Sequence, residues 1–201
     1  MIRSIIFDMG NVLRDFSPMR SILPYVTGPD AELIARELFG KEEWRGLDRG
    51  TITYGEAARL CKARIPQRLH GKVDEILDHW HEYMPEDPEM AEVCRRLKEN
   101  GYRLYLLSNA SVRFEAYRNE FQALKHFDGA IVSAFYQAVK PDEKIYRILF
   151  DTYSLKPEEC FFVDDNPENV AAGRRLAMPG HVFTGDLNAM MADFAAYGIR
   201  L

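Results

Sequence analysis

The sequence predicts an α/β protein, with a doubly wound parallel sheet and a helical segment inserted after the first strand. Short apolar runs such as residues 5–7 and 160–163 have the composition of strands buried on both faces. Amphipathic helices alternate with these runs, except between residues 14 and 85, where only helical patterns occur. We therefore predict a core domain of residues 1–13 and 86–201 and a helical cap domain of residues 14–85.

The strands expected in the core are short apolar runs bounded by turn residues. They cover residues 5–7, 102–107, 130–132, 160–163 and 181–183.

The helices expected between these strands carry start and stop signals. Asp87 followed by Pro88 marks a helix start, Gly101 marks the end of that helix, and Pro167 suits a first helical turn. Further helices are expected after residue 111 through about residue 124, opening at residues 140–142, and from residue 187.

Three amphipathic helices are expected in the cap. The first covers residues 30–39, with Asp30 as its N-cap. The second starts with the capping-box pattern of Thr53 and Glu56 and runs to residue 65, where a proline stops it. The third shows the helical period in its apolar residues, which are Val73, Ile76, Leu77, Trp80 and Met84.

The bulk composition excludes several classes of protein. The chain has 201 residues and a net charge of −5 without a long run of one sign, which disfavours a nucleic-acid binder. No apolar stretch approaches the roughly 20 residues needed to span a bilayer. The three cysteines are scattered, which suits a reducing compartment, and residues 1–4 lead directly into a strand with no room for a signal peptide. We expect a cytoplasmic protein.

Polar side chains follow three of the expected strands at the point where each strand ends. Asp8 follows the first strand, residues 108–109 (Ser-Asn) the second and residues 164–165 (Asp-Asp) the fourth, while Lys140 precedes a helix. Taken alone, each has an ordinary structural explanation as a cap, a turn residue or a solvated lysine. Because the carboxyl ends of parallel strands meet at one edge of a sheet, we expect them to converge there.

The converging groups suit one kind of chemistry. Carboxylates brought together repel each other unless a cation lies between them, and oxygen ligands suit Mg²⁺. A hydroxyl, a backbone amide and an ammonium group can hold the oxygens of a phosphate. With its charge neutralised by the metal and Lys140, a carboxylate can attack phosphorus and form an aspartyl-phosphate.

Four motifs in order resemble those of the haloacid dehalogenase superfamily, in the phosphatase-rich branch with a small helical cap. They are residues 7–13 (FDMGNVL), 107–109 (LSN), 140–141 (KP) followed by 145–146 (IY), and 162–166 (FVDDN). The resemblance spans nearly the whole chain. It implies a Rossmann-like core with strand order 5-4-1-2-3 and a C1-type cap between the first two motifs.

The resemblance also implies a role for each matching residue around the phosphoryl group. Asp8 would be the nucleophile and a metal ligand. Ser108 and the backbone amide of Asn109 would hold the phosphoryl group, and Lys140 would neutralise charge and orient Asp8.

On the metal side, the resemblance implies an Mg²⁺ ion. The backbone carbonyl of Gly10 and the carboxylates of Asp8 and Asp165 would be its ligands. Asp164 would reach the metal through water or support its ligands from behind.

One position departs from the pattern of most phosphatases in this superfamily. They carry a second aspartate two residues after the nucleophile, which protonates the leaving oxygen and later activates water, and here that position is Gly10. Losing a general acid and base removes about 10²–10⁴-fold in rate, and less where the leaving group is good. Arg14, Asp15 or a cap residue are the alternatives that could take over this role.

The turn at residues 44–53 and the Asp-x-Gly-Asn-Val opening resemble the glucose-1-phosphate phosphatase-like group, which also has glycine at the position of Gly10. Several residues near the start of the cap are candidates for substrate specificity. They are Arg14, Asp15, Arg20, Trp44 and Arg45.

The leading hypothesis is therefore an Mg²⁺-dependent phosphatase for a small phosphorylated metabolite, with a sugar phosphate favoured. One alternative is a 2-haloacid dehalogenase, which would use Asp8 against carbon without a metal; the acidic pair at 164–165 argues against it. Another is a phosphate- and metal-binding module with little catalysis, because Gly10 replaces the usual acid. The sequence favours neither a monomer nor a homodimer.

Overall fold

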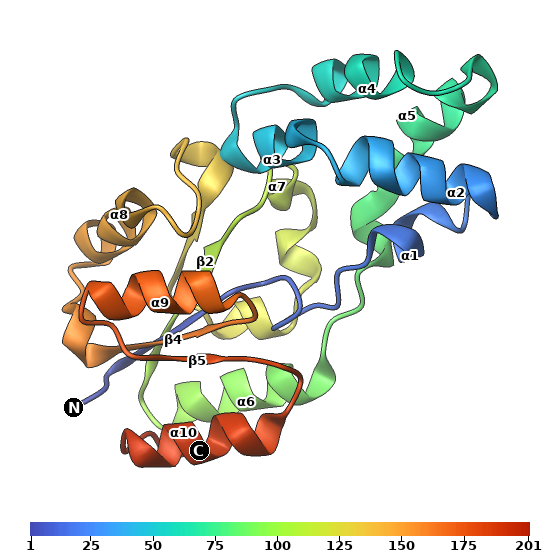
Figure 1. The fold of residues 1–201 in the computed structure, drawn as a ribbon. Helices are drawn as coiled ribbons and strands as arrows, with labels where there is room; N and C mark the ends of the chain where they lie inside the picture. Colours follow the sequence, from blue (N-terminus) through green and yellow to red (C-terminus); the bar gives the residue numbers. More distant parts are fainter.

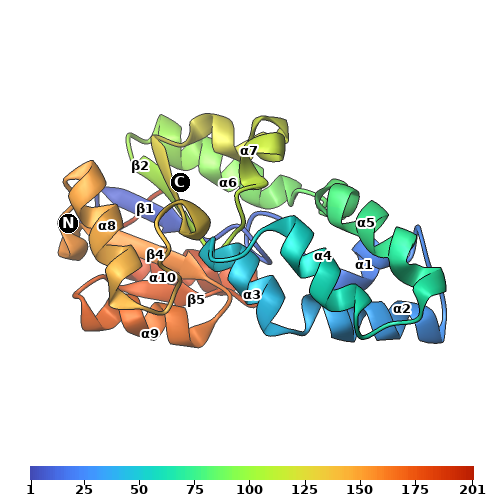
Figure 2. The same cartoon turned by 90° about the horizontal axis from the view of Figure 1, so that it is seen from above.

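The computed structural model describes residues 1–201 and contains one five-stranded, all-parallel sheet (Figures 1 and 2). The strand order is β3-β2-β1-β4-β5, which confirms the predicted order of 5-4-1-2-3 read from the other edge. The strands are β1 (Ser4–Phe7), β2 (Arg103–Ser108), β3 (Gly129–Val132), β4 (Cys160–Asp164) and β5 (Gly180–Val182).

Strand β1 lies in the middle of the sheet and is buried on both faces, as its unbroken apolar run predicted. Because side chains alternate along a strand, Ile5 and Phe7 face one layer of the core while Ile6 faces the other. Helices α6 and α10 cover the first face, and α8 and α9 cover the second (Figure 1). This two-sided cover is the doubly wound arrangement that the sequence predicted.

The core helices begin largely where their start signals lie. The side chain of Asp87 accepts the backbone N–H groups of Glu89 and Met90, and that of Asn166 accepts the N–H of Glu168. These helices are α6 (Pro88–Glu99), α7 (Phe114–Tyr117), α8 (Glu143–Tyr153), α9 (Pro167–Arg175) and α10 (Leu187–Ala196).

The helix expected to run to about residue 124 is broken, so that prediction was wrong. Helix α7 has only four residues, and two short 3₁₀ segments follow it, Arg118–Glu120 and Ala123–His126. The carboxylate of Glu86 accepts the backbone N–H groups of Gln122 and Ala123 at 3.0 and 2.7 Å. These N–H groups are therefore not available to a continuous helix.

A helical segment, residues 18–83, lies between β1 and α6 and extends away from the sheet (Figures 1 and 2). It contains α1 (Pro18–Ile22), α2 (Pro29–Ile34), a π-helical turn (Ala35–Phe39), α3 (Glu42–Arg49), α4 (Tyr54–Lys62), a 3₁₀ turn (Gln67–Leu69), α5 (His70–His79) and a further 3₁₀ turn (Trp80–Tyr83).

Of two helix starts predicted in this segment, one is confirmed and the other is wrong. The capping box of Thr53 and Glu56 is present at the start of α4. Asp30 is not an N-cap, because Pro29 takes the first helical position and Gly28 the cap.

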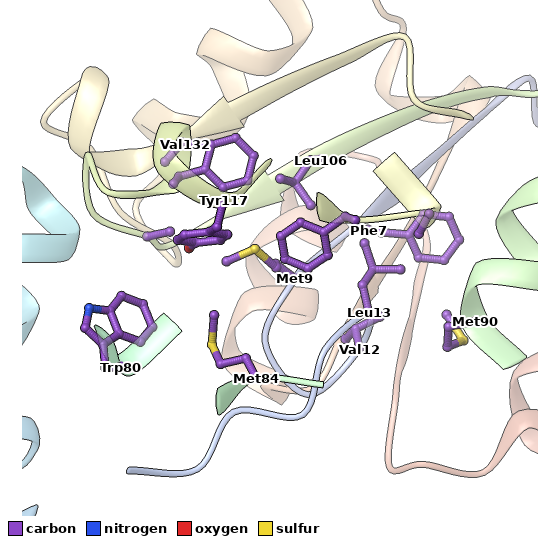
Figure 3. Close-up of a cluster of buried hydrophobic side chains, with 14 of the residues drawn as sticks. Phe7, Met9, Val12, Leu13, Trp80, Met84, Met90, Leu106, Tyr117 and Val132 are labelled. Atoms are coloured by element: carbon purple, nitrogen blue, oxygen red, sulfur yellow. The ribbon is translucent and has the colours of Figure 1, made fainter. Parts of the chain in front are cut away.

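The apolar core runs without interruption from the sheet into the helical segment. Phe7 and Met9 belong to the same buried cluster as Trp80, Met84 and Tyr117 (Figure 3). The helical segment is therefore packed on the sheet edge through shared apolar side chains.

Helix α3 also contacts the 3₁₀ turn that follows β3 (Ser133–Phe135). Gly50 ends α3 with a φ of +72°, and a Cβ added there would lie 2.2 Å from the carbonyl oxygen of Ala134. Only glycine combines this left-handed conformation with so close an approach. The direction of the chain after α3 is fixed by this contact.

No helix of the structure combines the length and apolar character needed to cross a bilayer.

Candidate active site

The polar residues that follow the strands come together at one sheet edge. Phe7, the last residue of β1, pairs with Leu106 of β2 and Val163 of β4. Asp8 therefore lies between the ends of its two neighbouring strands, where Ser108 and Asp164 are found. The parallel topology alone brings these three side chains together, as predicted from the sequence.

Lys140 joins two of the carboxylates at the centre of this site. Its Nζ lies 2.8 Å from Oδ1 of Asp8 and 2.6 Å from Oδ2 of Asp164. The side chains of Lys140 and Asp164 are 1% and 0% exposed, so these contacts are shielded from water. Charge-assisted hydrogen bonds of this kind are short and strong, which fixes the orientation of Asp8.

Asn109 holds the backbone of Lys140 in place. Its side-chain Nδ2 donates to the carbonyl of Lys140 at 3.0 Å, and its Oδ1 accepts the backbone N–H of Lys140 at 2.8 Å. The end of β2 thereby fixes the loop before α8. The sequence predicted only a backbone role for Asn109, because nothing local indicates this long-range pair.

Asp164 has both carboxylate oxygens engaged within the protein. Oδ2 accepts from Lys140, and Oδ1 accepts the backbone N–H of Asn166 at 2.8 Å and Nδ2 of Asn169 at 2.9 Å. The hydroxyl of Tyr146 in turn donates to the carbonyl of Asn169 at 2.8 Å. Asp164 is thus fully hydrogen-bonded before any ligand binds.

Asp165 is more accessible than Asp164 and is oriented by a residue that the sequence analysis missed. Nδ2 of Asn11 donates to its Oδ2 at 2.9 Å, while Oδ1 of Asn11 accepts the N–H of Phe16 at 3.1 Å. Asn11 has a φ of +55°, a conformation that asparagine tolerates better than most residues. Its place in the turn three residues after Asp8 was the signal that could have identified it.

Three carboxylates are close enough to share a cation. Asp8, Asp164 and Asp165 each offer an oxygen, and these three oxygens lie within 4.8 Å of one another. An all-oxygen donor set is the kind that Mg²⁺ prefers, and their mutual repulsion favours a cation between them. The residues present therefore fit the predicted magnesium ion.

The charges at the site shift the pKa values of its central pair. Burial raises the pKa of Asp8 to about 6, although Lys140 acts against this rise, and the charge of Asp164 adds to it. Burial alone would lower the pKa of Lys140, but Asp8 and Asp164 together raise it above its ordinary value. Lys140 is therefore a permanent cation at this site.

A cavity of about 200 Å³ opens above Asp8. One wall is aromatic. Trp44 is stacked on Phe16 with their ring centroids 6.2 Å apart, and it packs edge-on against Trp80 with ring centroids 5.1 Å apart. We call this cavity the reaction pocket. Its lining is Asp8, Met9, Gly10, Asn11, Arg14, Phe16, Trp44, Asp48, Trp80, Met84, Ser108, Asn109, Ala110 and Asp165.

The structure separates the five candidate specificity residues. Arg14 and Trp44 line the reaction pocket. Asp15 lines a wider outer groove and pairs with Arg20 at 2.5 Å, and Arg45 pairs with Glu42 on the exposed face of α3 at 2.7 Å. Arg20 and Arg45 are not part of the lining of the reaction pocket.

The guanidinium of Arg14 is held by aromatic rings. It is 9% exposed and lies 3.8 Å from the ring centroid of Phe121. Its Nε and Nη1 have no hydrogen-bond partner, and burial lowers its pKa below the ordinary value.

Together, the fold and the site define a parallel α/β protein with an aspartate–lysine–aspartate centre at the carboxyl edge of its sheet. The chain belongs to the haloacid dehalogenase-like hydrolases, whose family model matches residues 2–176.

Curated relatives share moderate similarity with the chain. Mouse bifunctional epoxide hydrolase 2 is 24% identical over 131 residues, which are 63% of this chain and 23% of the relative. Phosphoserine phosphatase of Thermus thermophilus is 29% identical over 91 residues, covering 45% of this chain and 36% of that protein. The chain spans about a quarter or less of the length of the epoxide hydrolases that it matches.

Solved structures share the complete fold. A predicted HAD-like family hydrolase from Porphyromonas gingivalis has a TM-score of 0.74 at 24% identity, covering 96% of this chain and 98% of that one. The HAD family enzyme bt-2542 from Bacteroides thetaiotaomicron, in complex with magnesium and inorganic phosphate, has a TM-score of 0.70 at 19% identity, with 94% and 99% coverage. The L-2-haloacid dehalogenase of Xanthobacter autotrophicus, with chloropropionic acid covalently bound, has a TM-score of 0.67 at 15% identity, with 100% and 85% coverage.

Proposed function

We propose that this protein is an Mg²⁺-dependent phosphatase that transfers the phosphoryl group of a small metabolite to Asp8 and then to water. One observation carries the proposal. Lys140 bridges Asp8 and Asp164 beside three carboxylate oxygens that lie within 4.8 Å of one another. A buried cation beside a cation-binding set of carboxylates suits a substrate with several negative oxygens.

The hydrogen bonds of Asp8 favour it as the nucleophile. Its Oδ1 accepts a hydrogen bond from the backbone N–H of Met9 at 2.7 Å and forms an ion pair with Nζ of Lys140 at 2.8 Å. Oδ2 is thereby left for the attack on phosphorus, and Lys140 keeps the carboxylate in one orientation during that step.

The residues around Asp8 divide into a metal side and a phosphate side. Asp8, Asp165 and the carbonyl of Gly10 would hold Mg²⁺, with Asp164 acting through water. When bound, the ion supplies positive charge to the phosphate oxygens. Ser108 and the backbone amide of Asn109 line the pocket next to Asp8, where they can bind the transferring phosphoryl group.

The reaction pocket supports a small substrate. Its volume of about 200 Å³ leaves room for a compact molecule beside the phosphoryl group. Trp44 and Phe16 line the pocket together with polar side chains, a combination that suits a sugar phosphate. The glucose-1-phosphate phosphatase-like group remains our preferred subgroup on this basis.

Two similar proteins support a phosphatase reaction. The Bacteroides enzyme was solved with magnesium and inorganic phosphate, and the Thermus protein is a phosphoserine phosphatase.

The structural similarity to an L-2-haloacid dehalogenase makes dehalogenation the second candidate reaction. That reaction would use Asp8 against carbon and would need no metal. The close set of three carboxylates argues against it, because these groups repel one another without a cation.

A phosphate-release screen over sugar, acyl and nucleotide phosphates tests the proposal, with Mg²⁺ and with a chelator. We expect release that needs Mg²⁺ and disappears in Asp8→Asn with the fold retained, as judged by circular dichroism. Asp151→Asn, an exposed aspartate on α8, is the matched control and should behave as the wild type.

Three results would contradict the proposal. Turnover retained by Asp8→Asn would remove the nucleophile, and chloride release without metal would favour the dehalogenase. Binding of phosphate and Mg²⁺ without turnover of any ester would indicate a binding module.

A further inference from the structure

The turn after β1 provides no group that could protonate a leaving oxygen. Gly10 has no side chain, and a Cβ added there would meet only Cβ of Phe16, at 4.0 Å. An ester of a simple alcohol needs a proton on its leaving oxygen as the bond to phosphorus breaks. This proton must come from elsewhere in the reaction pocket.

Few side chains that line the pocket can carry such a proton. Asp8 and Asp165 belong to the nucleophile and the metal-binding set, and the guanidinium of Arg14 does not give up its proton at ordinary pH. Asp15 is paired with Arg20 in the outer groove. Asp48 is the remaining acid in the lining.

Asp48 enters the reaction pocket from the helical segment. It lies in the last turn of α3, and its backbone carbonyl accepts a hydrogen bond from the hydroxyl of Ser133. The same hydroxyl oxygen accepts the backbone N–H of Ala110 at 3.0 Å, in the loop that begins with Ser108 and Asn109. Asp48 is therefore held in a fixed position relative to the residues that follow β2.

The side chain of Asp48 is free to act. No hydrogen bond or ion pair engages its carboxylate, which lies near enough to Asp8 for their charges to interact. Every other acid of the site has a hydrogen-bond or ion-pair partner, as Asp8 has Lys140 and Asp165 has Asn11. An unpaired carboxyl that lines the same small pocket as the nucleophile is placed to exchange a proton with a bound substrate.

We propose that Asp48 is the general acid and general base of this phosphatase, in place of the side chain missing at Gly10. This inference rests on the proposed function. In the first step, Oδ2 of Asp8 bonds to phosphorus, the bond from phosphorus to the leaving oxygen breaks, and the Asp48 carboxyl gives its proton to that oxygen. The alcohol then leaves and Asp48 is a carboxylate.

The second step restores the enzyme. Asp48 takes a proton from a water molecule whose oxygen bonds to phosphorus, while the bond from phosphorus to Asp8 breaks. Inorganic phosphate is released, Asp8 returns to a carboxylate and Asp48 is again protonated. Atoms, protons and charge balance over the two steps.

The surroundings of Asp48 favour the protonated form that the first step needs. Burial raises the pKa of Asp48 to about 8, and the charge of Asp8 adds to this rise. Tyr54 of α4 and Tyr117 of α7 interact with the charge of Asp48, and Arg14 lines the same pocket. Both tyrosines have a raised pKa through burial and so remain neutral.

Rapid-mixing kinetics of Asp48→Asn test the proposal, with p-nitrophenyl phosphate and glycerol phosphate as substrates. Nitrophenolate leaves without a proton, so the first turnover should keep nearly the wild-type rate and release about one equivalent per enzyme. The steady state should then slow by about 10²–10⁴-fold, because hydrolysis of phosphorylated Asp8 lacks its base. Glycerol phosphate should give no burst, because its first step also lacks the acid.

Acid quenching should trap the phosphorylated enzyme during this stalled phase, and Asp8→Asn should abolish the burst. The variant Glu42→Gln, on the exposed face of the same helix, should leave both phases unchanged. The double variant Gly10→Asp with Asp48→Asn should recover steady-state turnover, because the space at Gly10 admits a side chain.

Equal loss with both substrates and no burst would overturn the role of Asp48 while leaving the proposed function intact. Unchanged kinetics of Asp48→Asn would do the same. Turnover that survives Asp8→Asn, or no phosphate release by the wild type, would overturn both.

Discussion

Replacing Lys140 with methionine removes the cation that holds the site together, while keeping a side chain of similar length. Two buried carboxylates then face each other without the ammonium group that lies 2.8 and 2.6 Å from them. A hydrogen bond to a charged group contributes about 1.5–3 kcal/mol. Breaking a buried ion pair from one side costs roughly 3–5 kcal/mol, and we expect a loss of stability of this size at pH 8.

The loss should depend on pH in a direction that follows from the pKa of Asp8. That pKa is raised to about 6 even with Lys140 present, and without Lys140 it rises further. The cost of keeping the Asp8 carboxylate ionised without its partner is present above this pKa and disappears as Asp8 takes up a proton. At pH 5 the destabilisation should therefore fall to about half or less of its value at pH 8.

Urea unfolding followed by circular dichroism at both pH values measures this effect. Lys144→Met is the matched control, because Lys144 is exposed near the start of α8 and makes no ion pair. It should change the free energy of unfolding by no more than about 0.5 kcal/mol at either pH. A loss in Lys140→Met that is the same at pH 5 and pH 8 would refute the electrostatic explanation and leave only lost packing.

Three further variants probe the supports of the site. Gly50→Ala should lower the free energy of unfolding by more than about 2 kcal/mol in urea titration, because its Cβ would lie 2.2 Å from the carbonyl of Ala134; a neutral result would mean that this contact yields easily. Asn109→Ala should cost about 1–3 kcal/mol and reduce phosphate release, because two hydrogen bonds to the backbone of Lys140 are lost; full activity would show that the loop needs no such clamp. Asp48→Asn should be more stable than the wild type by about 1–3 kcal/mol at pH 8.5 and nearly equal to it at pH 4. The folded-state pKa of Asp48, about 8, lies above the ordinary 3.8, so the wild type loses stability as the pH rises between these two values. Thermal melts in which the two proteins show a parallel pH dependence would contradict this.

The sequence predicted the central part of the site because sheet topology decides it. Once the runs at 5–7 and 160–163 are strands of one parallel sheet, Asp8 and the residues from 164 must share an edge. The strand order came from the resemblance of the four motifs rather than from any local pattern.

What the sequence could not predict depends on contacts between distant segments. The break after Tyr117 follows from the carboxylate of Glu86, thirty-six residues before the first amide it binds. The entry of Asp48 into the reaction pocket follows from the packing of α3 on the turn after β3. Residues 44–53 were predicted to form a turn, but residues 42–49 form helix α3, so that prediction was wrong. No local pattern in these residues distinguishes Asp48, which lines the pocket, from the exposed Arg45.

The hydrogen bond from Ser133 to the carbonyl of Asp48 restricts which helical segments can be exchanged between family members. A chimaera that received residues 18–83 from another protein would bring its own residue at position 48 but would keep Ser133 from this one. The donor segment would then have to present a carbonyl to that hydroxyl in the same register as α3 does here. Compatible donors can therefore be selected by a glycine at position 50, which permits the close approach of α3 to the carbonyl of Ala134, before any catalytic residue is compared.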